Sequence, residues 1–154
     1  MSDTHSDQTA DNRPLGPYET LGMMGWLMSH ADYHSRWPLW SLKDDMLPPL
    51  LNNQYRIYLD EERTPVGFVT WAWLNQVGKQ KALEQSGCLA LEDWNAGEDL
   101  MINDFVAPWG HARQMAKDLT QGLFANAQGF ALRRNPDGSV RKMMLGHGRE
   151  AAKD

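Results

Sequence analysis

Residues 66–73, within the stretch PVGFVTWAWL, constrain the fold more than any other part of the chain. Their β-branched and aromatic residues predict a strand, in which side chains alternate between two faces. Each face then receives three apolar residues: Val66, Phe68 and Ala72 on one, Val69, Trp71 and Trp73 on the other. A strand that is apolar on both faces needs cover on both, so the sequence predicts a central strand in a sheet between helices.

Other segments predict the elements that surround this strand. Strands are expected over 54–59, 100–107, 129–134 and 139–145, the last two about a turn at 135–138. Helices are expected over 39–51, 76–86 and 111–127, after one that starts at residue 18, and a short one within 87–94. The order α-α-β-β-α-β-α-β-β predicts a single domain of the α/β or α+β class, with helices covering a mostly antiparallel sheet.

The helix expected from residue 18 is apolar nearly all round, which predicts that it is buried. Its apolar run, residues 21–28, has eight residues, far fewer than the ~20 of a membrane span. Trp26 of this helix is expected in the core, together with Trp71 and Trp73 of the central strand.

Composition excludes several classes of protein. Fifteen Lys and Arg against 20 Asp and Glu give a net charge of −5, which argues against nucleic-acid binding. Cys88 is the single cysteine, so an internal disulfide and a cysteine-built zinc site are excluded, and a reducing cytoplasm is the expected compartment. Residues 1–17 are polar, acidic and unlike a secretory signal, so we expect a disordered leader there and one domain over 18–154.

Two residues are candidates for chemistry, since nucleotide-binding loops and the motifs HExxH and GxSxG do not occur in the sequence. His34 lies in the polar segment SHADYHSRWP, where it is either an exposed loop residue or a functional one. His30 stands four residues before it, but no third ligand accompanies the two, so no metal site is predicted. Asp104 interrupts an apolar strand segment; it is either satisfied by backbone amides or a functional acid or base.

Three motifs occur together: H-x-x-W-P at 34–38, N-Q-Y at 53–55 and D-x-x-A-P-x-G at 104–110. With the stretches GWLMSHADYHSRWPLWSL, PVGFVTWAWLN and RRNPDGSVRKMMLGHG, they resemble the RTX toxin-activating lysine acyltransferases of Gram-negative bacteria. The resemblance covers residues 21–148. It implies a fold like that of the Gcn5-related acetyltransferases, and an enzyme that moves a fatty acyl chain from acyl carrier protein to internal lysines of an RTX protoxin.

The resemblance also implies that His34 and Asp104 are the catalytic residues. A lysine attacks a thioester only as the free amine, so a base that accepts its proton is required. We therefore expect direct transfer, with His34 as general base and Asp104 as the carboxylate that orients it. A covalent acyl intermediate on His34 is the competing route. Backbone amides of residues 106–110 are the expected donors to the thioester oxygen.

Substrate-binding roles are expected for residues in and near these motifs: Arg36, Trp37, Asp45, Trp109 and Gly110. Trp37, Trp40 and Trp109 are candidates to line an acyl-chain channel. Arg36 and the hairpin residues Arg133, Arg134, Arg141 and Lys142 are candidates to face an acidic carrier protein, or else form a solvated surface. Asp45 stands where the family has an asparagine, and a carboxylate accepts hydrogen bonds but does not donate them.

The expected co-substrate is the phosphopantetheine thioester of acyl carrier protein, with no bound cofactor, and the expected assembly is a homodimer. One alternative is an acetyl-CoA-dependent N-acetyltransferase, but the segment APWGHARQM lacks the glycine-rich pyrophosphate loop of that class. The other is a non-catalytic module that binds an RTX protein. It would be favoured if His34 and Asp104 lay far apart.

Overall fold

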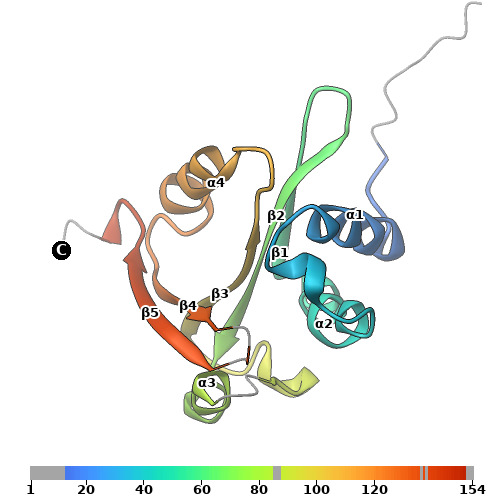
Figure 1. Cartoon of the computed structure of the whole chain (residues 1–154). Coiled ribbons are helices and arrows are strands. Elements are labelled where there is room, and N and C mark those ends of the chain that lie inside the picture. The colour runs from blue at the N-terminus through green and yellow to red at the C-terminus, as the bar shows by residue number, and fades with distance from the viewer. Residues whose placement is uncertain (1–12, 85–87, 136, 138, 152–154) are drawn as a thin grey trace, which may run out of the picture.

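A five-stranded sheet runs through the protein in the order β1-β2-β3-β4-β5 (Figure 1). The computed structural model describes residues 13–84, 88–135, 137 and 139–151. Its strands are β1 Tyr55–Leu59, β2 Pro65–Leu74, β3 Asp99–Val106, β4 Gln128–Arg134 and β5 Val140–His147. Only β3 and β4 are parallel; the other three neighbouring pairs are antiparallel. The α+β class and the mostly antiparallel sheet are confirmed, and likeness to the Gcn5-related fold stays a prediction.

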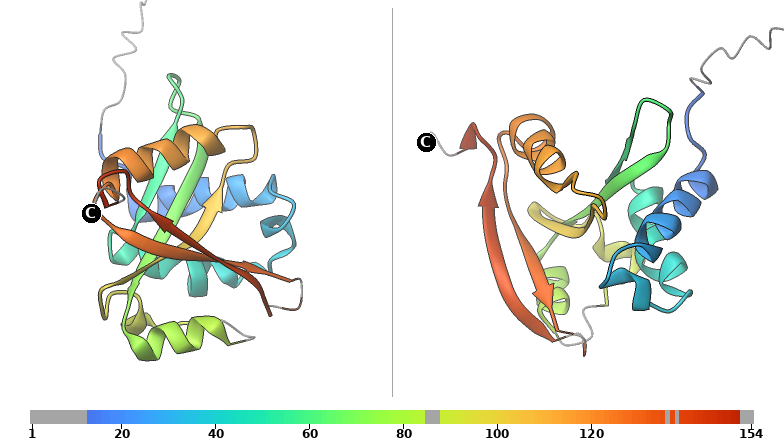
Figure 2. Two further views of the ribbon diagram at one scale, coloured as in Figure 1. Left: turned by 90° about the vertical axis from the view of Figure 1, so that its left-hand side faces the viewer. Right: turned by 45° about the horizontal axis from the view of Figure 1, so that its top comes forward.

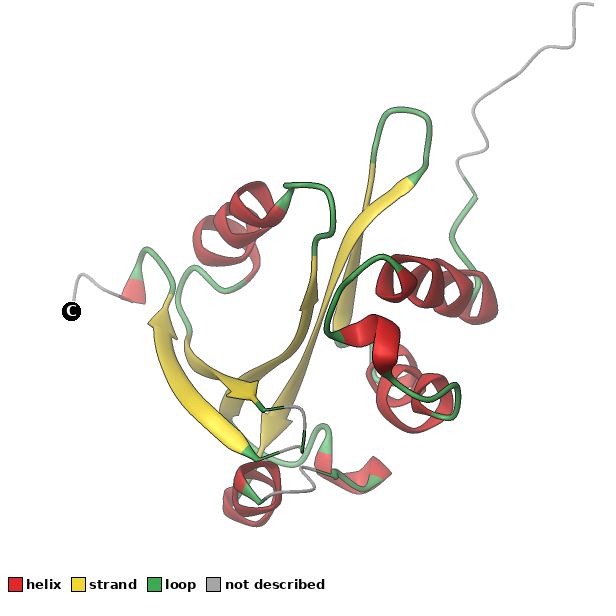
Figure 3. Cartoon of the chain, viewed as in Figure 1, coloured by secondary structure: helices red, strands yellow, loops and turns green. Residues whose placement is uncertain are grey.

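Helices cover both sides of the sheet, as Figure 3 shows by element type. The helical elements are α1 Pro17–Ser29, η1 His34–Arg36, η2 Leu42–Met46, α2 Leu47–Leu51, α3 Gln76–Leu83, η3 Leu91–Asp93, α4 Ala112–Asp118 and η4 Leu119–Leu123. The helices expected over 39–51 and 111–127 are each divided, because η2 and η4 are π-helical turns joined to α2 and α4. Pro48 and Pro49 fit the first turn of α2, where backbone N–H groups have no partner within the helix.

The predicted central strand is confirmed, because β2 is buried on both faces. Phe68 packs on one face with α1 and α2, through Met24, Leu27 and Leu50. On the other face, Val69 and Trp71 pack with Leu100 and Leu119, beneath α4 and η4. A third cluster, around Ala72, Leu74, Ala82 and Trp94, joins the end of β2 to α3 and η3. The views agree that α1 and α2 lie on one side of β2 and α4 on the other (Figures 1 and 2).

The prediction that α1 is buried all round is wrong. Thr20, Met24, Leu27 and Met28 form a single buried face, because the sheet covers the helix from one side only. Trp26 is 44% exposed, so its expected place in the core is wrong as well. Trp71 is buried as predicted, and Trp73 is half-buried against the ring of Phe124.

Most of the expected leader, residues 1–12 of 1–17, lies outside the described residues. Within the remainder, Arg13 makes a two-nitrogen ion pair with Glu19, and Pro17 begins α1. None of the helices in the described part of the chain has the length and hydropathy to cross a membrane.

One carboxylate fastens α4 to the first strand. Asp118, the last residue of α4, accepts a hydrogen bond of 2.6 Å from the Tyr58 hydroxyl and pairs with the Arg56 guanidinium at 2.8 Å. The Tyr58 hydrogen bond and the Arg56 charge hold the pKa of the Asp118 carboxyl below its ordinary value. These two contacts span more than fifty residues of chain and fix α4 over the face that carries Val69 and Trp71.

We predict that Asp118→Asn lowers the free energy of unfolding at pH 7 by roughly 1 kcal/mol, since both contacts are partly exposed. A carboxyl whose pKa is lowered by folding stabilises the protein above its unfolded pKa, near 3.9. The difference from the unmodified protein should therefore shrink as the pH falls below about 4. Urea unfolding across this range measures it. Asp44→Asn, which removes an exposed contact of 3.6 Å to Lys43, is the control and should cause no loss. A difference for Asp118→Asn that does not change with pH would contradict the prediction.

Candidate active site

His34 and Asp104, seventy residues apart in sequence, form a hydrogen bond of 2.9 Å between Nε2 and Oδ1. The side chain of His34 is only 10% exposed and that of Asp104 5%. His34 begins the short helix η1, which follows α1 and rests on the sheet beside β3. The interpretation of His34 as an exposed loop histidine is therefore wrong, and the structure brings together the two residues expected to be catalytic.

A β-bulge in β3 turns Asp104 toward His34. Thr70 of β2 pairs with Asp104, but the next residue, Trp71, pairs with Ile102, so Asn103 is an extra residue on β3. Before the bulge, Leu100 and Ile102 face α4; after it, Val106 faces α1. Regular alternation would have put Asp104 on the side of Ile102. The bulge reverses this and places the carboxylate on the side of His34.

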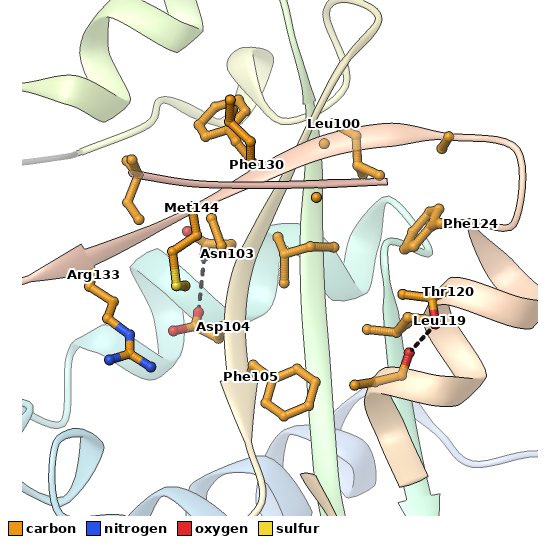
Figure 4. Close-up of a pocket in the computed structure, with 18 of the residues that line it drawn as sticks. Leu100, Asn103, Asp104, Phe105, Leu119, Thr120, Phe124, Phe130, Arg133 and Met144 are labelled. Carbon is orange, nitrogen blue, oxygen red and sulfur yellow. Dashed lines mark hydrogen bonds between the residues drawn. The ribbon is translucent and has the colours of Figure 1, made fainter. Parts of the chain in front are cut away.

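Neighbouring side chains satisfy the rest of the Asp104 carboxylate. Its Oδ2 accepts hydrogen bonds from Asn103 Nδ2 at 2.9 Å, drawn in Figure 4, and from the Thr70 hydroxyl at 3.4 Å. The Thr70 oxygen in turn accepts from the Asp104 backbone N–H. A carboxylate held in this way binds the protonated Nε2 of His34 and leaves the lone pair on Nδ1. In the part of the chain that the structure describes, no group hydrogen bonds to that Nδ1.

Aromatic rings surround His34. The ring of Trp37 lies 4.6 Å from the imidazole, and that of Tyr33 lies 5.1 Å away, edge to face. Partial burial and the charge of Asp104 raise the pKa of the Tyr33 hydroxyl above its ordinary value. These rings limit access of water to the imidazole and fix its orientation.

A cavity of about 700 Å³ begins at this pair and extends between β3 and β4 (Figure 4). The two strands pair only where Leu100, Met101 and Ile102 meet residues 129–131, and they separate beyond the bulge. Most of the side chains that line the cavity are apolar, among them Leu100, Ile102, Phe105, Leu119, Phe124 and Met144. An apolar cavity that ends at a hydrogen-bonded histidine suits a substrate with a long hydrocarbon part.

The remaining candidate residues are distributed around this cavity and away from it. Trp37, Arg133, Arg134 and Arg141 line it. Arg134 also donates hydrogen bonds to the carbonyl oxygens of Ala82 and Glu84 at the end of α3. The described residues that line the cavity do not include Arg36, Trp40, Trp109, Gly110 or Lys142.

Trp109 takes part in an exposed aromatic cluster that sequence reasoning did not find. Its ring lies 5.1 Å from that of Trp26 and 5.2 Å from that of His30. The cluster joins α1 to the loop after β3, and His30 also contacts the Trp26 carbonyl through Nδ1. No group of three or more metal-ligating side chains occurs among residues 13–84 and 88–151 as far as they are described.

Comparison with known proteins decides the family. A model of the RTX toxin acyltransferase family matches residues 14–145. The chain belongs to this family. Among the similar proteins, the RTX-I toxin-activating lysine-acyltransferase of Actinobacillus pleuropneumoniae is 31% identical to this chain over 137 residues, which are 89% of this chain and 78% of the relative. The protein-lysine myristoyltransferase of Escherichia coli is 31% identical over 137 residues, 89% and 76% of the two chains. An uncharacterised protein of Synechocystis is 34% identical over 119 residues, 77% and 81% of the two chains.

The predicted family and the predicted enzyme class, an acyltransferase, are thus confirmed. In this acyltransferase the histidine of H-x-x-W-P and the aspartate of D-x-x-A-P-x-G are joined directly. Asp45, in η2, lies in a smaller cavity with Trp40, Asp44 and Leu51. Burial, the charge of Asp104 and that of Asp44 raise the pKa of Asp45 to about 6. Besides Asp104, the acyltransferase therefore has a second carboxylate, Asp45, whose negative charge is unfavourable in the folded protein and is repelled by that of Asp104.

We predict that Asp45→Asn stabilises the protein at pH 7 to 8. A carboxyl whose pKa is raised by folding destabilises the folded state above that raised value, and this cost is absent below the unfolded pKa near 3.9. The gain in free energy of unfolding should therefore diminish between pH 6 and about 4. Denaturant unfolding at a series of pH values tests this. Asp32→Asn, at an exposed position, serves as control, and equal behaviour of the two variants would disprove the assignment.

Proposed function

We propose that this acyltransferase moves a fatty acyl group from acyl carrier protein to the ε-amine of lysines in an RTX protein and so activates it. One observation carries the proposal: the His34–Asp104 pair stands at one end of an apolar cavity of about 700 Å³. The base and the room for an acyl chain are thus adjacent. The names of the relatives describe toxin-activating lysine acyltransferases and a myristoyltransferase, and this supports the same substrates here.

His34 acts as the general base in the proposed reaction. The lysine nitrogen attacks the thioester carbonyl carbon while Nδ1 of His34 takes a proton from the amine. Asp104 keeps the proton on Nε2 and stabilises the imidazolium that forms. The carbon–sulfur bond then breaks, the imidazolium returns the proton to the departing thiolate, and the products are the amide and the free thiol. Backbone amides of residues 106–110 are the proposed donors to the carbonyl oxygen.

Basic residues at the rim of the cavity are the proposed contacts for the carrier protein. Arg133 and Arg141 line it, and Lys142 follows on β5. These residues are positively charged, although the net charge of the whole chain is −5. Positive charge at the entrance attracts an acidic partner and speeds its association, and salt should weaken this effect. Arg36, Trp37, Asp45, Trp109 and Gly110 keep their proposed substrate-binding roles, and the cytoplasm and a homodimer remain the proposed setting.

We predict that His34→Ala and Asp104→Asn stay folded but lose about 10² to 10⁴-fold in the rate of acylation. The purified chain is incubated with carrier protein bearing acyl chains of several lengths and with an RTX protein as acceptor. Peptide mass spectrometry then follows acyl addition to lysine. Asp32→Asn is the matched control for Asp104→Asn, because this aspartate is exposed and lies outside the cavity.

Three results would contradict parts of the proposal. Full activity of His34→Ala would remove its role as base. Transfer from acetyl-CoA but from no acyl carrier protein would favour an N-acetyltransferase. An acyl group trapped on His34 with carrier protein alone would replace direct transfer by the covalent route.

A further inference from the structure

Two glycines face each other in the wall of the cavity. Gly129 of β4 and Gly146 of β5 are directly paired, and both line the cavity. Opposite residues of an antiparallel pair point to the same face of the sheet. Gly129 lies against Leu100, whose side chain packs beneath α4, so this glycine pair faces the apolar part of the cavity.

The glycine pair lies far from the catalytic residues. Leu100, the β3 partner of Gly129, precedes Asp104 by four residues of the same strand. At about 3.3 Å per residue, this separation is on the order of 10 Å. His34 and Asp104 lie on the α1 side of the sheet and the glycine pair lies on the α4 side, and residues from both sides line the cavity. An acyl chain whose thioester lies at His34 and whose carbons pass through the gap where β3 and β4 separate therefore reaches Gly129 and Gly146 with its distal part.

Backbone hydrogen bonds join the end of β5 to the end of η4 just beyond the glycine pair. Gly148 donates a backbone hydrogen bond of 2.7 Å to the carbonyl of Ala127, and Arg149 donates one to that of Thr120. Phe124, which begins the turn before β4, packs its ring edge to face against Trp71. The segment after β5 is thus fastened to the end of η4, and both segments line the cavity.

The two glycines differ in the room around them. A Cβ on Gly129 would lie 3.0 Å from the backbone oxygen of Leu100, so the close approach of β4 to β3 requires glycine there. A Cβ on Gly146 would meet no atom within 4 Å. The strand therefore does not need glycine at 146 for packing, and a side chain at this position would occupy cavity space.

We propose that Gly146 determines which acyl chains the enzyme accepts, because its missing side chain leaves the space that the distal carbons of a long, unbranched fatty acyl group occupy. This inference rests on the proposed function. Apolar groups line this space, so the binding affinity of an acyl chain increases with each methylene that is buried there. A larger residue at 146 shortens the usable cavity and leaves the thioester position at His34 unchanged.

The experiment compares Gly146→Ala, Gly146→Val and Gly146→Leu with the unmodified chain. Carrier protein charged with butanoyl, octanoyl, dodecanoyl or hexadecanoyl groups is the donor, and the rate of lysine acylation is measured for each. We expect Gly146→Leu to lose at least about tenfold with the hexadecanoyl donor and nothing with the butanoyl donor, and the smaller side chains to fall between. Gly22→Leu is the size-matched control, since both glycines are exposed and a Cβ at either meets no atom within 4 Å, but Gly22 lies on α1 and does not line the cavity.

Binding of non-reactive S-alkyl pantetheines of the same lengths, followed by tryptophan fluorescence, gives a readout that does not need turnover. If the unmodified chain transfers nothing, the proposed function fails, and this binding series still tests the inference. Loss of affinity confined to long chains in Gly146→Leu supports it. An unchanged preference for length overturns it, and so does an equal loss at every length, which would place the pantetheine arm at Gly146. Retained butanoyl transfer or short-chain binding shows that the variant is folded.

Discussion

The hydrogen bond between His34 and Asp104 is the interaction around which the candidate site of this acyltransferase is arranged. A buried carboxylate is costly unless its oxygens are satisfied, and here His34, Asn103 and Thr70 supply the donors. The same contact fastens the segment after α1 to the middle of the sheet. One interaction therefore serves both the fold, by holding η1 against β3, and the chemistry, by fixing which imidazole nitrogen is left to accept a proton.

The bulge at Asn103 and the separation of β3 from β4 belong together. The extra residue interrupts the regular hydrogen bonding and increases the local twist of β3. The residues of β3 after the bulge therefore face the opposite side of the sheet, and they no longer pair with β4. The left view of Figure 2 shows the hairpin of β4 and β5 crossing the direction of the first three strands. The cavity occupies the space between the two parts of the sheet. The contacts of Asp118 to Arg56 and Tyr58 hold α4 over the face of the sheet that carries Val69 and Trp71.

Asp45 lowers the stability of the folded protein at neutral pH. A half-buried carboxylate near Asp104 and Asp44 weakens the folded state at neutral pH. Local costs of this kind are typical of functional sites, whose geometry is maintained by the stability of the rest of the domain. Here the double-sided burial of β2 supplies that stability, since three apolar clusters meet on this strand.

The sequence by itself determined the elements, the class of the fold and the family. The alternation of side chains over residues 66–73 was sufficient to predict a strand that is covered on both faces, because both faces are apolar. The motifs around His34 and Asp104 were sufficient for the candidate catalytic pair. Their direct contact, the exposure of Trp26 and the bulge at Asn103 were decided only in three dimensions. Composition and periodicity describe neighbours along the chain, whereas a bulge register, the exposed side of an apolar helix and a contact across seventy residues arise when separate elements pack together.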